Sequence, residues 1–496
     1  MVAPPCSWVW PFNMEKPLLT LSTKDFLTGI APSAHTERGG LFFTATGVTP
    51  VYDPGGTASI ENGLLQAGPT ATDFTASTVV DVPFASVSGV NGNFLYILGA
   101  SGHLYSKGLA AAAVTDERSG TPITSPANGI TIWAPAGGTN QVYYWRETTI
   151  GKWDGAAYPG GFNDTLYSGL TATKLHPVHQ FVGNVYYGNY SVVGALLDAG
   201  AAAITSTTNV LDIKNSELIT ALSDDGTYLV IAATSNVSGG NRFARNTIYF
   251  WDTSASSWQR EYEIRDPFIF ALKKVGNTLY AIGQYGIYEV SFAGVRKVLS
   301  RLVGFGTVAD FLAGYGTTRA AVYNHEALLL ATDTTIDSFG KLSPDLPFAY
   351  YKSFKVSSGR PSLIDTNLDV GRVYVATSTP KLYAFDFNSA TRDTNVSFQT
   401  IYIPFKQRTL IHRIDVIFGE PLASGDAFDI DTKVDEDTAA VDFGSASFTS
   451  DGAIRRKSMY PDKKVTVDNQ LSIVGNFTGG AAKIKKIEVY GTPMTP

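Results

Sequence analysis

Short runs of β-branched and aromatic residues, each bounded by glycine-containing turns, recur along most of the chain. In Val275–Val290 (VGNTLYAIGQYGIYEV), two such runs flank a four-residue turn, Gly283–Gly286. This pattern is typical of a β-hairpin. The segment Gly92–Tyr105 (GNFLYILGASGHLY) repeats it, because a Gly-Asn pair, a Leu-Tyr pair and two later glycines coincide without gaps. A hairpin that occurs twice predicts further copies.

Further copies begin at a regular spacing. Each starts with glycine or a polar turn residue followed by an apolar strand, near residues 92, 140, 183, 226, 276, 324 and 371. Neighbouring starts lie 43 to 50 residues apart, the length of one four-stranded propeller blade. The sequence therefore predicts a β-propeller of roughly seven blades over residues 84–397. An array of β-sandwiches with evenly spaced turns is the alternative explanation.

Aromatic residues mark two of the predicted repeats. Tyr144-Trp145 is followed by Trp153, and Phe250-Trp251 is followed by Trp258. Aromatic pairs across a hairpin stabilise it by roughly 0.2–1 kcal/mol each. We expect these side chains to pack between blades; a sugar-binding surface is the alternative.

The N-terminal residues 1–83 do not follow the repeat, and we expect an extended arm followed by an irregular β segment. Trp8, Trp10 and Phe12 lie among prolines, which cannot donate to a sheet ladder and so favour an edge, a loop or a strap. Exposed aromatic side chains on an arm are suited to docking on a partner subunit. These three residues are therefore candidate subunit contacts; packing on the chain's own propeller is the alternative.

The C-terminal residues 398–496 follow a different pattern of apolar and polar positions. Apolar and polar residues alternate in Ala427–Asp435 and again in Ile484–Tyr490. About 100 residues of short antiparallel strands are typical of a β-sandwich, here one resembling a jelly roll.

Composition supports an all-β chain, with 48 glycines, 25 tyrosines and 28 phenylalanines among 496 residues. Charged residues make up only 17%, and the net charge of −6 argues against a nucleic-acid-binding face that depends on phosphate contacts. No stretch of apolar residues is long enough to predict a membrane span. The single cysteine, Cys6, excludes an intrachain disulfide. The first residues lack the basic and apolar regions of a signal peptide. If the protein works outside a cell, we expect it to leave by another route, such as lysis or assembly into a particle.

Candidate metal ligands are few. His176 and His179 form the only close histidine pair, but positions three apart on a strand face opposite sides. The acidic run over residues 426–437 offers carboxylates that could bind Ca²⁺. It lacks the glycine and glutamate spacing of an EF-hand, and a solvated strand followed by an acidic turn is the expectation. We predict no metal and no cofactor.

Catalytic motifs are also absent from the sequence: it contains no HExxH, GxSxG or P-loop pattern. A glycosidase on a propeller would need two carboxylates in a shared pocket. Acidic residues that could serve are available, but their positions in the sequence do not bring them together: Asp224, Asp225, Asp252, Glu261 and Asp386. We predict that the protein is not an enzyme.

An aromatic N-terminal arm, Tyr-rich GNxLYxxG hairpins and a last strand reading IKKIEVYG (Ile484–Gly491) follow one another in this chain. In this order they resemble the tail hub or nozzle family of short-tailed bacteriophages. The resemblance implies a non-enzymatic virion protein, made in the host cytoplasm, that forms a homo-oligomeric ring around the DNA exit channel. It implies contacts with other tail proteins, and DNA that passes during ejection without specific binding. The alternative is a carbohydrate-binding or glycan-degrading propeller that contacts a host-surface glycan.

Overall fold

The computed structural model describes residues 16–26, 41–46, 48–50, 64–68, 70–73, 83–88, 94–108, 114–118, 120–237, 244–300, 307–315, 319–323, 327–332, 335–340, 349–356, 359–367, 372–379, 381–386, 392–394, 396–422, 424–435, 437, 439–447, 454–479 and 482–494. The chain divides into two compact units. The larger is Gly68–Thr391, and the smaller combines Met1–Ala67 with Arg392–Pro496. The predicted divisions, after residues 83 and 397, lie 16 and 6 residues beyond these boundaries.

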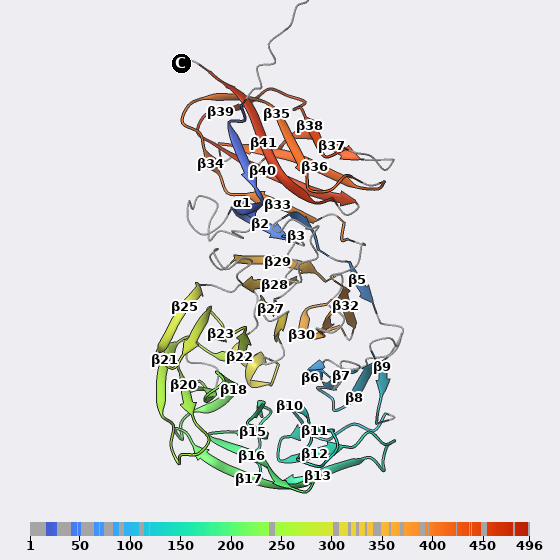
Figure 1. Cartoon of the computed structure of the whole chain (residues 1–496), viewed down its shortest axis with the longest axis vertical. Helices are drawn as coiled ribbons and strands as arrows, with labels where there is room; N and C mark the ends of the chain where they lie inside the picture. The colour runs from blue at the N-terminus through green and yellow to red at the C-terminus, as the bar shows by residue number, and fades with distance from the viewer. Residues whose placement is uncertain are drawn as a thin grey trace, which may run out of the picture. The chain divides into compact units, whose positions relative to one another are not determined.

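The larger unit contains seven sets of four antiparallel strands among its described residues, six of them separate sheets and one part of a longer sheet. Figure 1 shows these sets arranged in a circle. The first four blades are β6 (Pro83–Ser88), β7 (Phe94–Gly99), β8 (Leu104–Gly108) and β9 (Val114–Asp116); β10 (Pro126–Trp133), β11 (Gln141–Arg146), β12 (Thr149–Trp153) and β13 (Phe162–Ser168); β14 (Val178–Phe181), β15 (Asn184–Asn189), β16 (Val192–Gly200) and β17 (Ala203–Asp212); β18 (Leu218–Asp224), β19 (Leu229–Thr234), β20 (Arg245–Trp251) and β21 (Arg260–Arg265).

The remaining three blades complete the circle. They are β22 (Ile269–Val275), β23 (Thr278–Gly283), β24 (Gly286–Ser291) and β25 (Gly294–Ser300); β26 (Ala320–Tyr323), β27 (Ala327–Ala331), β28 (Thr335–Gly340) and β29 (Ala349–Lys355); β30 (Pro361–Asn367), β31 (Arg372–Thr377), β32 (Leu382–Asp386) and β5 (Ala71–Asp73).

The predicted repeat corresponds to the second strand of each blade. These strands, β7, β11, β15, β19, β23, β27 and β31, begin one to three residues after the predicted starts. The reason is physical: the second strand has a neighbour on each side, so its side chains are almost all buried, as in β19. The β-propeller fold is confirmed, and the alternative of a sandwich array is wrong.

The last blade takes its fourth strand from the N-terminal side of the chain. In β5, Ala71 and Asp73 pair with Phe385 and Tyr383 of β32. This strand lies within residues 1–83, where an irregular β segment was expected. Its three residues carry no apolar alternation, so the local pattern could not predict a partner more than 300 residues away.

The smaller unit consists of two antiparallel sheets, in agreement with the predicted β-sandwich. One sheet contains β3 (Val48–Pro50), β4 (Leu65–Ala67), β41 (Ile484–Pro493), β35 (Thr409–Phe418) and β38 (Arg456–Met459), with β1 (Leu19–Ser22) on β41 and β39 (Val465–Val467) on β35. The other contains β2 (Phe42–Thr46), β33 (Val396–Thr400), β40 (Gln470–Gly479), β36 (Ala427–Val434) and β37 (Val441–Ser447), with β34 (Ile403–Pro404) on β40. Strands from both ends of the chain thus build one unit.

Helical structure is limited to two short segments in the part of the chain that the structure describes. They are α1 (Thr23–Phe26) and α2 (Val308–Leu312). Thr307 caps α2 by accepting the Asp310 amide, and the Asp310 carboxylate accepts the Thr307 amide in return, as in a capping box. Neither described helix has the length and apolar character needed to cross a bilayer.

Aromatic side chains fill the space between neighbouring blades. The ring centroids of Trp145 in β11 and Tyr187 in β15 lie 5.6 Å apart, and those of Tyr186 and Trp251 lie 5.8 Å apart. Trp145 is fully buried. The interpretation of these tryptophans as packing between blades is confirmed for Trp145 and Trp251.

Candidate functional site

A cavity of about 360 Å³ lies where the first strands of all seven blades meet. Each of β6, β10, β14, β18, β22, β26 and β30 contributes lining residues, so this cavity is the central channel of the propeller. Small apolar side chains line much of it: Ala221, Ala271, Ala320 and Ala321. Register shifts in β18 and β22 precede the lining residues, and such bulges redirect side chains.

Two side chains of opposite charge face this channel, Lys273 from β22 and Asp365 from β30. Asp365 accepts a hydrogen bond from the Ser86 hydroxyl at 2.9 Å and one from the Thr366 amide at 2.8 Å. Lys273 is half-buried and forms no hydrogen bond, and no ion pair within 4 Å, with any described residue. Burial lowers the pKa of Lys273, while the charge of Asp365 acts in the opposite direction. The channel therefore holds a cation whose hydrogen-bonding capacity is unused by the described residues.

The next lysine along β22 is used differently. Lys274 donates to Asp224 at 3.3 Å, and the other oxygen of Asp224 lies 2.8 Å from Nε2 of His179. The His179 hydrogen bond is the largest cause that lowers the pKa of Asp224 to about 2. Asp224 is consequently ionised at neutral pH and is unsuited to act as a general acid.

His176 and His179 do not share a site, as their spacing in the sequence predicts. His176 is buried, and its ring nitrogens lie 2.7 Å from the Gly188 carbonyl oxygen and 3.1 Å from that of Glu147. Burial lowers its pKa. His179 instead pairs with Asp224, so the two rings serve separate sites.

The other carboxylates considered for glycoside hydrolysis have separate local partners. Asp225 and Asp252 accept backbone amides within their own turns. Glu261 pairs with Lys214 at 2.8 Å, and Asp386 lies 3.5 Å from Arg372. None of these four carboxylates lines the central channel.

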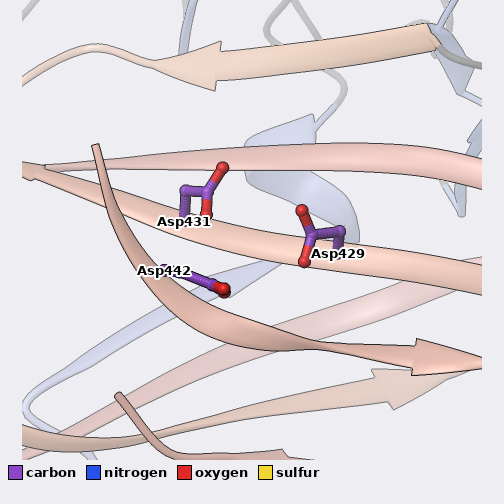
Figure 2. A group of neighbouring side chains, drawn as sticks. All are labelled: Asp429, Asp431 and Asp442. Atoms are coloured by element: carbon purple, nitrogen blue, oxygen red, sulfur yellow. The ribbon is translucent and has the colours of Figure 1, made fainter. Parts of the chain in front are cut away.

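Three carboxylates gather in the smaller unit, and Figure 2 shows Asp429 and Asp431 on one strand with Asp442 on the neighbouring strand. One oxygen from each lies within 4.8 Å of the others. Burial, and secondarily the neighbouring carboxylates, raises the pKa of Asp429 and of Asp431. Oxygen ligands in this arrangement have the chemistry of a Ca²⁺ site, although acidic side chains also cluster without an ion.

The predicted acidic run, 426–437, contains only part of this cluster. It includes Asp429 and Asp431 but not Asp442, which the register of β36 and β37 places opposite Asp431. Asp435 belongs elsewhere: its carboxylate accepts the backbone amides of Asp468, Asn469 and Gln470, and these bonds lower its pKa. The candidate docking residues Trp8, Trp10 and Phe12 lie outside the described residues, as does Cys6.

No protein-family model matches this sequence, and no curated protein is similar enough to match it. Among solved structures, the chain is similar to the β-propeller domain of Cps50 (Swd1) from Myceliophteria thermophila. The identity is 11%, the TM-score is 0.42, and the similarity covers 64% of this chain and 99% of the other. Fold and channel together define a seven-bladed β-propeller protein with a β-sandwich unit.

Proposed function

We propose that this protein is a non-enzymatic structural component of a bacteriophage tail, of the tail hub or nozzle type. The observation that carries the proposal is that strands far apart in the sequence pair to complete each unit. In the propeller, β5 pairs with β32; in the sandwich, β1 and β4 pair with β41. A tail component must keep its shape while DNA is driven past it, and closed sheets resist opening at their edges.

The propeller channel itself is not the DNA path in this proposal. A cavity of about 360 Å³ lined by side chains accommodates a small molecule, not a duplex. DNA would instead pass through an opening that several copies enclose as a ring. The net charge of −6 supports passage without adhesion, because phosphate contacts supply most of non-specific DNA affinity.

Mass photometry and electron-microscopy class averages of the purified full-length protein test this proposal. We expect a closed ring of identical subunits, and mass spectrometry of purified phage particles should find the protein in the tail. A strict monomer that cleaves a host-surface polysaccharide would refute the structural role and would establish the alternative, a glycan-degrading propeller.

A further inference from the structure

We propose that the central channel of the propeller binds one small organic acid, whose carboxylate pairs with the ammonium group of Lys273. The preferred ligand class carries a hydroxyl or amino group next to the carboxylate. This inference concerns the channel of a single subunit, and it does not depend on the tail role proposed above.

The contrast between two neighbouring lysines supports the site. Lys273 and Lys274 follow each other in β22, so their side chains point to opposite faces of the strand. Lys274 has an anionic partner, Asp224, at 3.3 Å. Lys273 faces the channel without a hydrogen bond or close ion pair to the described residues. The channel therefore presents a cation that an external anion can reach.

The cost of keeping this cation in the channel is the second argument. A partly buried ammonium loses part of its solvation unless a partner compensates it. Asp365 compensates only through its longer-range field, because no ion pair within 4 Å joins the two groups. A carboxylate bound directly to Lys273 would supply the missing charge-assisted hydrogen bond.

Size and polarity define the ligand class. A volume of about 360 Å³ is close to the lower end of small-molecule sites, which span roughly 300–1,000 Å³. Asp365 disfavours a ligand with several negative charges, since like charges repel at close range. Its carboxylate suits a ligand that donates a hydrogen bond from a hydroxyl or ammonium group beside its own carboxylate.

Isothermal titration calorimetry of the full-length protein with acetate, glycolate and glycine tests this site. We expect one saturable site per chain, with glycolate or glycine binding more tightly than acetate. Lys273→Met keeps most of the side-chain length without the charge and should weaken binding about tenfold or more, the equivalent of one charge-assisted hydrogen bond. Lys274→Met is the matched control and should bind as the wild type does.

A second measurement avoids any folding defect of the variants. Reductive ¹³C-methylation of the wild-type lysines gives NMR signals that report their pKa values. Burial lowers the pKa of Lys107 as well as that of Lys273. We therefore expect two signals with a lowered pKa, and the bound acid should raise the pKa of Lys273 alone. Absence of saturable binding for all three acids, or equal binding by folded Lys273→Met, would overturn the site. Equal affinity for acetate and for both substituted acids would overturn the hydroxy- or amino-acid assignment.

Discussion

Tyr350 of β29 donates a hydrogen bond to the carboxylate of Asp337 on the adjacent strand β28, and Asp337 is fully buried. Thr335 donates a second hydrogen bond at 2.5 Å. Burial dominates over these bonds and raises the pKa of Asp337 to about 6. A carboxylic acid in the sixth blade therefore gains its proton well above the pH at which an unfolded aspartate does.

This relationship predicts a pH dependence of stability. The folded state holds the Asp337 proton at higher pH than the unfolded chain, so ionisation costs stability as pH rises from about 4 to about 6. The cost at pH 7 is about 2 to 3 kcal/mol. Asp337→Asn, which stays neutral, should gain stability relative to wild type over this range. Melting temperatures measured from pH 4 to pH 8 check this.

Tyr350→Phe provides the companion variant for this experiment. Loss of the phenol hydrogen bond should raise the pKa of Asp337 further, so the pH range of the stability loss should move upward. Parallel pH profiles for wild type and Asp337→Asn would contradict the assignment of this titration to Asp337.

The strand that closes the propeller is the subject of a second prediction. Thr72 lies in the middle of β5, opposite Ala384 of β32. Thr72→Pro should disrupt this short ladder and destabilise the propeller by up to about 3 kcal/mol. Limited proteolysis should then cut the last blade faster than in wild type. Thr70→Pro, just before the strand, is the control, and an equal effect of both prolines would contradict a closing role for β5.

A charge network in the smaller unit leads to a third prediction. Arg456 binds the buried Asp415 through Nε at 2.9 Å and through Nη2, and its Nη2 also lies 3.3 Å from Glu488. Arg413 lies 3.2 Å from Asp415, without the alignment of a hydrogen bond. Arg456→Met should destabilise the sandwich by about 2 kcal/mol, because Asp415 stays buried without its main partner.

Arg408→Met is a matched control for that variant. Arg408 pairs with Asp468 at 2.8 Å, but both side chains are more than half exposed. Exposed pairs contribute about 0 to 1 kcal/mol, so this change should leave urea unfolding almost unaltered. Similar losses in both arginine variants would refute the distinction between the buried and the exposed pair.

The acidic cluster gives a fourth prediction. Asp442 is one cause of the raised pKa values of Asp429 and Asp431, so the three charges oppose one another at neutral pH. In a buffer that contains a metal chelator, Asp442→Asn should lower the pKa values of Asp429 and Asp431. It should stabilise the sandwich by less than about 1 kcal/mol. Urea unfolding at pH 7 measures this change in stability, and a loss of stability would contradict net repulsion among the three carboxylates.

Added Ca²⁺ provides a separate test of the same cluster. If Ca²⁺ stabilises the wild type but not the Asp442→Asn variant, the cluster binds the metal.

The parts of the fold that could be predicted are those whose pattern is visible within a short stretch of sequence. Each blade's second strand is buried on both faces and follows a turn, so strands such as Leu229–Thr234 appear in the sequence as short apolar runs. The closing strand Ala71–Asp73 has no such signal, because its position depends on pairing with a distant segment. The sandwich strands near the N-terminus were hidden for the same reason.

The channel site was missed for a related reason. Lys273 and Asp365 lie in different blades, and only closure of the circle brings their strands to one cavity. A signal was present: a lysine pair ends the apolar run IFAL at the start of the fifth blade. Without the side-chain directions of β22, however, the sequence could not show which lysine faces the channel.

The position of β5 in the chain also determines when a newly made molecule can finish folding. During translation, Asp73 leaves the ribosome about 310 residues before its partner Tyr383. At about 5–20 residues per second, roughly 15 to 60 s pass between the two events. β5 therefore has no partner until β32 has been made, and β1 waits still longer for β41. Each nascent polypeptide must therefore keep β1 and β5 unpaired until these distant partners have been made.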